Sequence, residues 1–338
     1  MINGNFKTNY EDEIKIFQTP FVKFWLALLF IGLVIFPFVA DRYIIYLINL
    51  CGIAIIGALG LNILTGYTGQ ISLGHAGFLA IGGYTSGILA KSLGLSPWIS
   101  ILIGGLVTAA LVTVFLGLPA LRLSGIYIAL LTLIFADSLS SILTQTRAIT
   151  GGAMGLHEIP GFIPNMEKIH AYYICFVFFL AMLYVIYRIV NSNNGLAFVA
   201  LRDSEHLAQT LGVNRYKERL KVFAIAAFLT GLAGGFYVHS LGDISPATLG
   251  IEPFLLCIAM VELGGVGTFA GPVLGSAVIV FGSEFLRLAG TLRLSMLGLL
   301  ICVTILFFPG GVMQLVEQVE GWLKERFRKQ SASKYPAD

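Results

Sequence analysis

The chain of 338 residues is 57% hydrophobic and only 12% charged, and its mean hydropathy is +0.87. Soluble domains are far less apolar, so the sequence indicates a protein that crosses a lipid membrane several times. A net charge of +3 is too small to favour nucleic acid as a partner. The four cysteines stand far apart in apolar segments without metal-ligand spacing, so we expect buried thiols and no metal site.

Apolar segments of roughly 17 to 25 residues, the length that crosses a bilayer as a helix, recur along the chain. The first of them follows an acidic cluster at 11–13, which favours a retained membrane helix over a cleaved signal. We expect an amino-terminal segment at 1–23, a membrane domain at 24–312 and an amphipathic tail at 313–338. The sequence predicts an all-α fold of about ten spans, at 24–40, 43–64, 70–90, 97–121, 123–144, 171–187, 222–241, 254–265, 268–285 and 294–312.

Basic residues gather on one side of this predicted topology. Arg122, the loop 188–221 and the carboxyl-terminal tail fall on the same side as the amino terminus, and together they carry most of the Lys and Arg. An excess of positive charge in short loops marks the cytoplasmic side of a membrane protein. We therefore expect both termini in the cytoplasm.

The segment 65–90 contains no Asp, Glu, Lys or Arg, yet it is rich in glycine and small polar residues. Irregular backbone at membrane depth is tolerated only where protein or a water-filled cavity satisfies its polar groups. The glycines either serve close helix packing alone or also mark a break that lines a translocation path. A lone membrane histidine such as His75 is more often bonded to a neighbouring helix than to a substrate. The candidate path residues in this segment are Thr68, Gln70, Ser72 and His75.

A second glycine-rich region spans 262–275 and contains Pro272, which ends or kinks a helix. Corresponding interruptions in two halves of a membrane protein indicate a translocation site. A carboxylate inside the bilayer costs roughly 2.5–3.5 kcal/mol, so Glu262 suggests function unless it lies at an interface. The candidate path residues here are Glu262, Gly264 and Gly265.

Regular glycine spacing also predicts close contacts between helices. Small residues four apart, as in a GxxxG pattern, let two helix backbones approach in a membrane. The expected packing glycines are Gly83, Gly87, Gly231, Gly235, Gly267, Gly271 and Gly275.

Catalytic chemistry finds no support in the sequence. No Walker loop, HExxH, GxSxG or zinc-ligand spacing is present, and nothing near His75 completes a nucleophile and base pair. For Asp137, well along the fifth span, we favour a structural or loop-pairing role. We expect no catalytic residue and no enzyme activity in this chain.

The loop 188–221 is the longest polar segment between spans. It predicts a short helix at 204–211 that stops at Gly212, too polar to cross the membrane and too short to be stable alone. Such a helix needs a partner to dock against, although a self-contained connecting loop is the alternative.

Five ordered segments of the chain read "LTGYTGQISLGHAGFLAIGGY", "LRLSGIYIALLTLIFA", "TGGAMGL", "ALRDSEHLAQTLGVN" and "GGVGTFAGPVLGSAVI". Together they resemble the permease subunits of high-affinity branched-chain amino acid ABC transporters of the LivM type. The resemblance implies the permease core shared with simple-sugar ABC importers, in a bacterial-type inner membrane. It also implies two cytoplasmic ATPase subunits that bind ATP and Mg, a sister permease subunit and a secreted substrate-binding protein. No cofactor is expected on this chain itself.

By this resemblance, 202–212 would be the coupling helix that docks on the ATPase. His206 and Leu207 depart from the small residues usual in that signature. Inserting a charge at Ala208 is expected to abolish ATP-driven uptake, because a docking helix must present a small apolar face. The implied coupling residues are Arg202, Asp203, Glu205, Ala208 and Gly212.

Together these features predict an importer that works by alternating access, in which ATP binding and hydrolysis move the broken spans through the loop helix. Leucine, isoleucine and valine are the substrates that the resemblance implies, and urea or amides are carried by similar proteins. A self-sufficient secondary transporter or channel is the alternative, although it would need several paired carboxylates or basic residues in the membrane.

Overall fold

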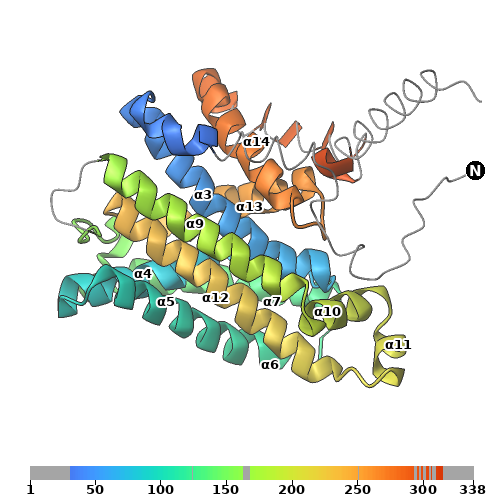
Figure 1. Cartoon of the computed structure of the whole chain (residues 1–338). Coiled ribbons are helices and arrows are strands. Elements are labelled where there is room, and N and C mark those ends of the chain that lie inside the picture. The colour runs from blue at the N-terminus through green and yellow to red at the C-terminus, as the bar shows by residue number, and fades with distance from the viewer. Residues whose placement is uncertain are drawn as a thin grey trace, which may run out of the picture.

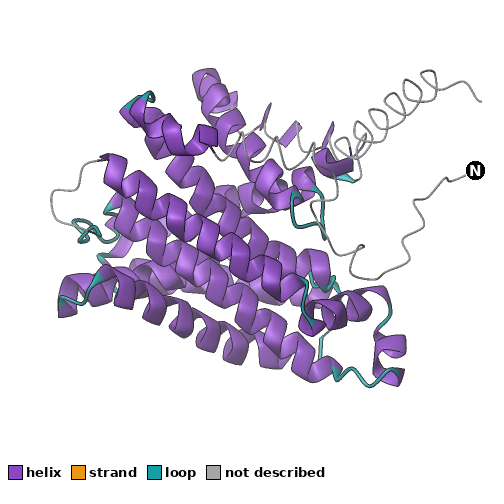
Figure 2. Cartoon of the chain, in the orientation of Figure 1, coloured by secondary structure: helices purple, strands orange, loops and turns teal. Residues whose placement is uncertain are grey.

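The computed structural model describes residues 31–123, 125–162, 168–249 and 251–292, with short stretches up to residue 314 (295, 296, 298, 299, 302, 303, 306 and 310–314). Regular structure within these residues is helical, apart from an isolated antiparallel bridge between Leu156 and Ile244 (Figure 2). The expected all-α membrane class is therefore confirmed for the described part. The segment 1–23, the start of the first predicted span at 24–30, about half of the last predicted span and nearly all of the tail lie outside it.

Five described helices are long and apolar enough to cross a membrane, at Arg42–Tyr67, Pro97–Ala120, Ile126–Gln145, Ile169–Val190 and Arg215–Leu241. Two shorter apolar helices stand at Leu255–Gly264 and Gly271–Phe285. The predicted total of about ten spans stays a prediction. The main helices are α3 (Arg42–Asn62), α4 (His75–Leu93), α5 (Pro97–Val112), α7 (Ile126–Gln145), α9 (Lys168–Val190), α10 (Asn193–Asp203), α11 (Glu205–Thr210), α12 (Arg215–Leu241), α13 (Ile251–Gly264) and α14 (Gly271–Phe285).

Short helical pieces extend or connect these helices. A π-helical turn, η2 (Ile63–Tyr67), lengthens α3 without a break, and η3 (Thr113–Gly117) with α6 (Leu118–Ala120) lengthens α5. The remaining pieces are η1 (Phe36–Phe38), α8 (Arg147–Thr150), η4 (Gly152–Met154), η5 (Pro246–Leu249) and η6 (Leu286–Leu292).

Local sequence signals explain several helix ends. Pro97 begins α5, where a missing N–H costs nothing because the first turn has no acceptor for it. The Asn214 side chain accepts a hydrogen bond from the backbone N–H of Lys217 and so caps the start of α12. Gly94 and Gly242 end α4 and α12 with φ angles of +62° and +85°, which favour glycine.

Helix α12 lies at the centre of the bundle and packs against α3, α4 and α5 (Figure 1). Its contact with α4 is so close that a side chain at Gly234 would overlap the carbonyl oxygen of Leu79. A side chain at Gly231 would similarly meet Thr108 of α5. The packing role expected for Gly231 thus agrees with its surroundings, and Gly234 is a packing glycine that the sequence reading missed.

The bundle has two ends that carry different structures. At one end, α10 and α11 lie beside the start of α12, and we call this the α11 end (Figure 1). The opposite end carries the Leu156–Ile244 bridge, and we call it the bridge end. Helix α7 runs from the α11 end, where Arg219 donates to the carbonyl oxygen of Leu123, to the bridge end, where it contacts η4 and η5.

Several predicted boundaries differ from the structure. The helix expected from Gln70 begins only at His75, because residues 68–74 form a connection whose Gly69 has a φ of +69°. The helix expected from 222 begins at Arg215, since the Asn214 cap lets two polar turns precede the apolar ones. The loop 188–221 is consequently largely helical and holds all of α10 and α11.

Candidate functional site: a junction of two glycine-rich connections

The two glycine-rich regions, far apart in sequence, meet at the α11 end. The first is the connection from η2 to α4, and the second is the connection 265–270 between α13 and α14. A side chain at Gly66 would overlap the backbone of Gly267, so the two segments touch with no room for a methyl group. We call this contact the inner junction.

Asn62, at the end of α3, fastens the inner junction. Its Nδ2 donates to the carbonyl oxygen of Thr268 over 2.8 Å, and its Oδ1 accepts from the N–H of Gly267 over 2.9 Å. The side chain is fully buried. The donor and the acceptor of this one amide thus both bind the backbone of the second connection, whose polar groups have no partner within a helix.

Arg202 brings the polar α10 region to the same place. Its Nη1 donates to the carbonyl oxygen of Gly66 over 2.9 Å, and its Nε pairs with Asp203 over 3.2 Å. A side chain at Gly267 would come within 2.6 Å of the same guanidinium nitrogen. One cation therefore touches both glycine-rich connections, and Asp203 orients it.

The candidate path residues of the first connection are all buried, but only some of their polar atoms have a hydrogen-bond partner. The Thr68 hydroxyl donates to the carbonyl oxygen of Leu64 over 2.5 Å, and His75 Nε2 lies 2.7 Å from the Thr230 hydroxyl on α12. Gln70 Oε1 and Ser72 Oγ have no hydrogen-bond partner among the described residues. His75 thus makes the helix-to-helix bond that its lone position suggested, while Gln70 and Ser72 keep free capacity for water or a solute.

At the second connection, the surroundings of Gly264 and Gly267 differ from those that their predicted roles suggested. Gly264 is a packing glycine, because a side chain there would overlap the Gly271 carbonyl oxygen. Gly267, expected to pack helices, instead lies in the loop with a φ of +76°. Glu262 is half-buried two residues before the end of α13, near the inner junction, and forms no ion pair or hydrogen bond within the described part. Whether it contacts a solute stays a prediction, as it does for Gly265.

The remaining packing glycines line helix contacts. A side chain at Gly83 would meet Ile244, and one at Gly87 would meet Ile159, both near the bridge end. A side chain at Gly235 would touch Ile101 of α5. On the other side of the bundle, side chains at Gly271 and Gly275 would overlap backbone oxygens of Gly265 and Met260.

Helix α11 is a single short turn capped by Ser204, whose hydroxyl accepts from the N–H of Leu207 over 3.3 Å. Gly212 follows it with a φ of +87°, so the predicted stop is present. Ala208 is 2% exposed and faces the chain's own interior. The expectation that Ala208 itself offers a docking face is therefore wrong in geometry, and the exposed side chains of α11 include Leu207 and, just after it, Leu211.

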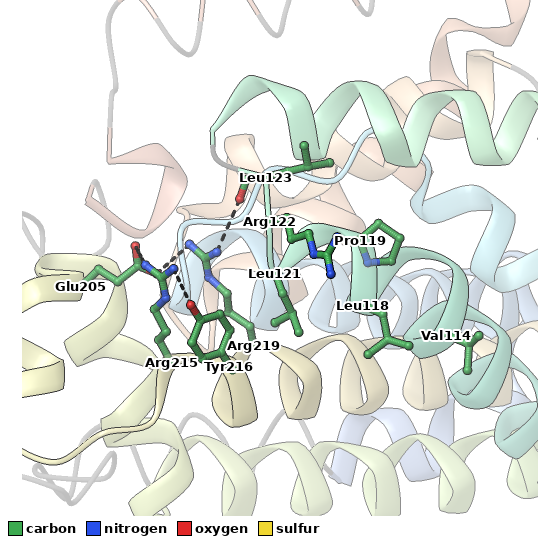
Figure 3. Close-up of a pocket in the computed structure, with 10 residues that line it drawn as sticks. All are labelled: Val114, Leu118, Pro119, Leu121, Arg122, Leu123, Glu205, Arg215, Tyr216 and Arg219. Atoms are coloured by element: carbon green, nitrogen blue, oxygen red, sulfur yellow. Dashed lines mark hydrogen bonds and ion pairs between the residues drawn. The ribbon is translucent and has the colours of Figure 1, made fainter.

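Glu205 ties α11 to α12. Its carboxylate pairs with Arg219 over 2.7 Å and with Arg215 over 3.6 Å. Beside this cluster a groove of about 1020 Å³ opens at the α11 end, with the two arginines reaching toward Glu205 from α12 (Figure 3). The groove is lined by Val114, Leu118, Pro119, Leu121, Arg122, Leu123, Glu205, Arg215, Tyr216 and Arg219.

Comparison with known proteins decides the family. The family described as branched-chain amino acid transport system, permease component, matches residues 43–308. The chain belongs to this permease family. The high-affinity branched-chain amino acid transport system permease protein LivM of Escherichia coli is 30% identical over 87% of this chain and 75% of its own length. The LivM protein of Salmonella typhimurium matches equally well, at 30% identity over 86% of this chain and 75% of its length.

Membership makes this chain a transmembrane permease subunit of an ABC transporter, as the five ordered segments implied. A more distant relative, the nucleoside ABC transporter permease protein NupC of Lactococcus lactis, is 26% identical over 57% of this chain and 66% of its own length. Proteins similar to this permease thus differ in the solutes that their names give. No solved structure matches the chain.

Asn62 is the residue of the permease's inner junction that sequence reasoning missed. It is one of two asparagines in the predicted span 43–64, and an amide within an apolar span was the available signal. Arg202 was expected to contact an ATPase, and its bond to Gly66 was not foreseen. Backbone contacts between distant segments leave no mark in a single sequence.

Proposed function

We propose that this permease subunit carries branched-chain amino acids across the inner membrane by ATP-driven alternating access, with the α11 end and both termini in the cytoplasm. The supporting observation is the bond from Arg202 to Gly66. Through this bond the polar α10–α11 region contacts the connection that joins α3 to α4, and the same guanidinium lies beside the connection that joins α13 to α14. A movement of α11 would thereby reach both connections at once.

Two cytoplasmic ATPase subunits, which bind the ATP and Mg, would supply that movement. The surface offered to them would be Leu207 and Leu211, which are 65% and 81% exposed, together with the groove beside Glu205. Large apolar side chains so exposed on a polar loop favour a protein contact. A sister permease and an external substrate-binding protein would complete the importer.

The docking surface makes a graded prediction for α11. Leu207→Asp should abolish leucine uptake and co-purification of the ATPase, because a charge would be buried in the contact. Gln209→Asp, on the same short helix, is the matched control and should retain both within about twofold. Ala208→Asp should also abolish uptake, but by unpacking α11 from its own chain, so its membrane level should fall as well. Normal uptake by Leu207→Asp at a normal membrane level would refute docking through this surface.

The function itself is tested by uptake of radiolabelled leucine in cells that lack other leucine importers. The cells would express this chain with its genomic neighbours, with and without the ATPase genes. Saturable uptake that disappears with the ATPase genes is the expected result. Uptake that persists without them but collapses with an ionophore would instead establish a self-sufficient secondary transporter, the alternative class.

A further inference from the structure

Asp137 lies deep within a helix that is long enough to span the membrane. It stands eleven residues after the first residue of α7 and eight before the last. At about 1.5 Å per residue, it lies some 16 Å from one end of the helix and about 12 Å from the other. The hydrocarbon core of a bilayer is about 30 Å thick. The carboxylate therefore falls near mid-membrane, too far from either end of the helix for the loop-pairing role that was expected.

Its side chain is exposed on the outside of the chain and has no hydrogen bond or ion pair with any described residue. Charged side chains at mid-membrane almost always face a bundle interior or a water-filled cavity, since lipid solvates them poorly. Glu262 differs, because it is half-buried and close to the end of its helix. The α7 surface around Asp137 therefore should not face lipid.

The face that carries Asp137 is well defined by the packing of α7. On the opposite side, Thr132 accepts a hydrogen bond from the N–H of Leu73 over 2.9 Å, and Ala136 sits against Gly77. Helical spacing places Leu130, Ile134, Asp137 and Ser141 on the face turned away from that contact. Helix α7 thus carries both the residues that pack against the first glycine-rich connection and the exposed residues around Asp137.

The exposed polar side chains of α7 near Asp137 lie on the bridge-end half of the helix. Toward the α11 end the exposed side is apolar, with Leu130 44% and Ile134 63% exposed. Toward the bridge end it is mixed, with Ser138, Ser141 and Gln145 exposed beside Ile142, which is 59% exposed. The carboxylate stands at the boundary between the two halves. In the proposed orientation, the half with the polar side chains opens to the outside, where a binding protein delivers the solute.

We propose that this face of α7 lines the translocation path and that the Asp137 carboxylate binds the ammonium group of an amino acid substrate. The inference rests on the proposed function. A zwitterionic solute needs an anionic partner for its ammonium group at mid-membrane, and the apolar surface of Leu130 and Ile134 just beyond suits a branched side chain. Solutes without an ammonium group, such as nucleosides, would gain nothing from this carboxylate.

The first test is transport by the assembled complex in proteoliposomes, with ATPase activity stimulated by the binding protein measured in parallel. Asp137→Asn should lower leucine uptake at least tenfold, mainly through a raised KM, while membrane level and basal ATPase activity stay unchanged. Asp137→Glu keeps the charge and should retain uptake within about threefold. Leucine uptake by Asp137→Asn equal to that of the unaltered chain would overturn the ammonium contact.

The second test separates this inference from the proposed function. Asp137→Cys in the assembled complex should react with a membrane-impermeant cationic thiol reagent, above the baseline set by the chain's own cysteines. Val177→Cys is the matched control, because Val177 lies mid-helix in α9, is 65% exposed and should face lipid. Unaltered complex that fails to take up leucine would refute the proposed function, yet this labelling would still report on the path.

Labelling of Asp137→Cys no faster than Val177→Cys would overturn the path-lining face. Labelling that is fast in this subunit alone but blocked in the assembled complex would overturn it too, since the face would then be a contact between permease subunits. Fast labelling in the complex, slowed by leucine with its binding protein, is the expected result.

Discussion

Glycine has different structural roles at the centre of the bundle and at the inner junction. Between α12, α4 and α5, Gly231 and Gly234 have helical dihedral angles and serve close contact alone, because any side chain there would strike a neighbouring helix. At the junction, Gly267 has a φ of +76° and forms loop backbone held by side chains from elsewhere. The first arrangement fixes helices by shape alone, and the second adds side-chain hydrogen bonds to a close backbone contact between loops.

The difference indicates which part can move. Close-packed helix contacts resist displacement, because a shift of a fraction of an ångström costs many contacts at once. The hydrogen bonds at the junction come from only two side chains, Asn62 and Arg202, so moving them would loosen the contact between the two connections. Arg202 is 38% exposed and comes from the polar region beside α11, so the junction is the place where an external force could act.

Changing the central contact should have the largest effect. Gly234→Leu would force a side chain into the backbone of α4, and we expect the amount of chain in the membrane to fall at least tenfold. Gly282→Leu is the matched control, because Gly282 lies within α14 with no atom within 4 Å of an added side chain. Quantitative immunoblots of membrane fractions measure both. Normal levels of Gly234→Leu would mean that α4 and α12 are not in backbone contact.

Removing the amide at the junction should reduce transport more than it reduces the amount of chain in the membrane. Asn62→Leu leaves the N–H of Gly267 and the carbonyl of Thr268 unpaired, each costing about 1–3 kcal/mol when buried. We expect leucine uptake per amount of membrane-inserted chain to fall about tenfold. Asn191→Leu is the control, since that exposed amide bonds only to its own helix. An Asn62→Leu chain that transports at the normal rate would show that the junction need not stay fastened.

Loosening α11 from α12 should have the smallest effect. Glu205→Gln weakens the pairs with Arg219 and Arg215, which are partly exposed and worth about 0.2–1 kcal/mol each. Uptake should fall about two- to fivefold, and ATPase activity should persist with less uptake per ATP hydrolysed. Glu218→Gln removes a pair with Lys221 inside α12 and serves as the control. Equal loss in both variants would mean that the link between α11 and α12 carries no coupling.

Local signals foretold the elements well where a few neighbouring residues decide them. The short helix at 204–211 and its stop at Gly212 follow from a Ser cap and a glycine, and α11 stands there. The start of α4 was predicted at Gln70 but lies at His75, because composition marks an apolar segment without marking its first helical turn. Ala208 was assigned to the surface because small size suits docking and burial equally well.

Composition and spacing by themselves indicated an all-α membrane protein with two glycine-rich regions and a polar helix between spans. The ordered segments determined its family. Only the tertiary structure decided that both regions meet at Asn62 and Arg202, because that contact joins residues more than 200 positions apart through backbone groups common to every residue type. Only the structure, likewise, placed Asp137 on the exposed face of α7, since the partners of a helix face are set by packing.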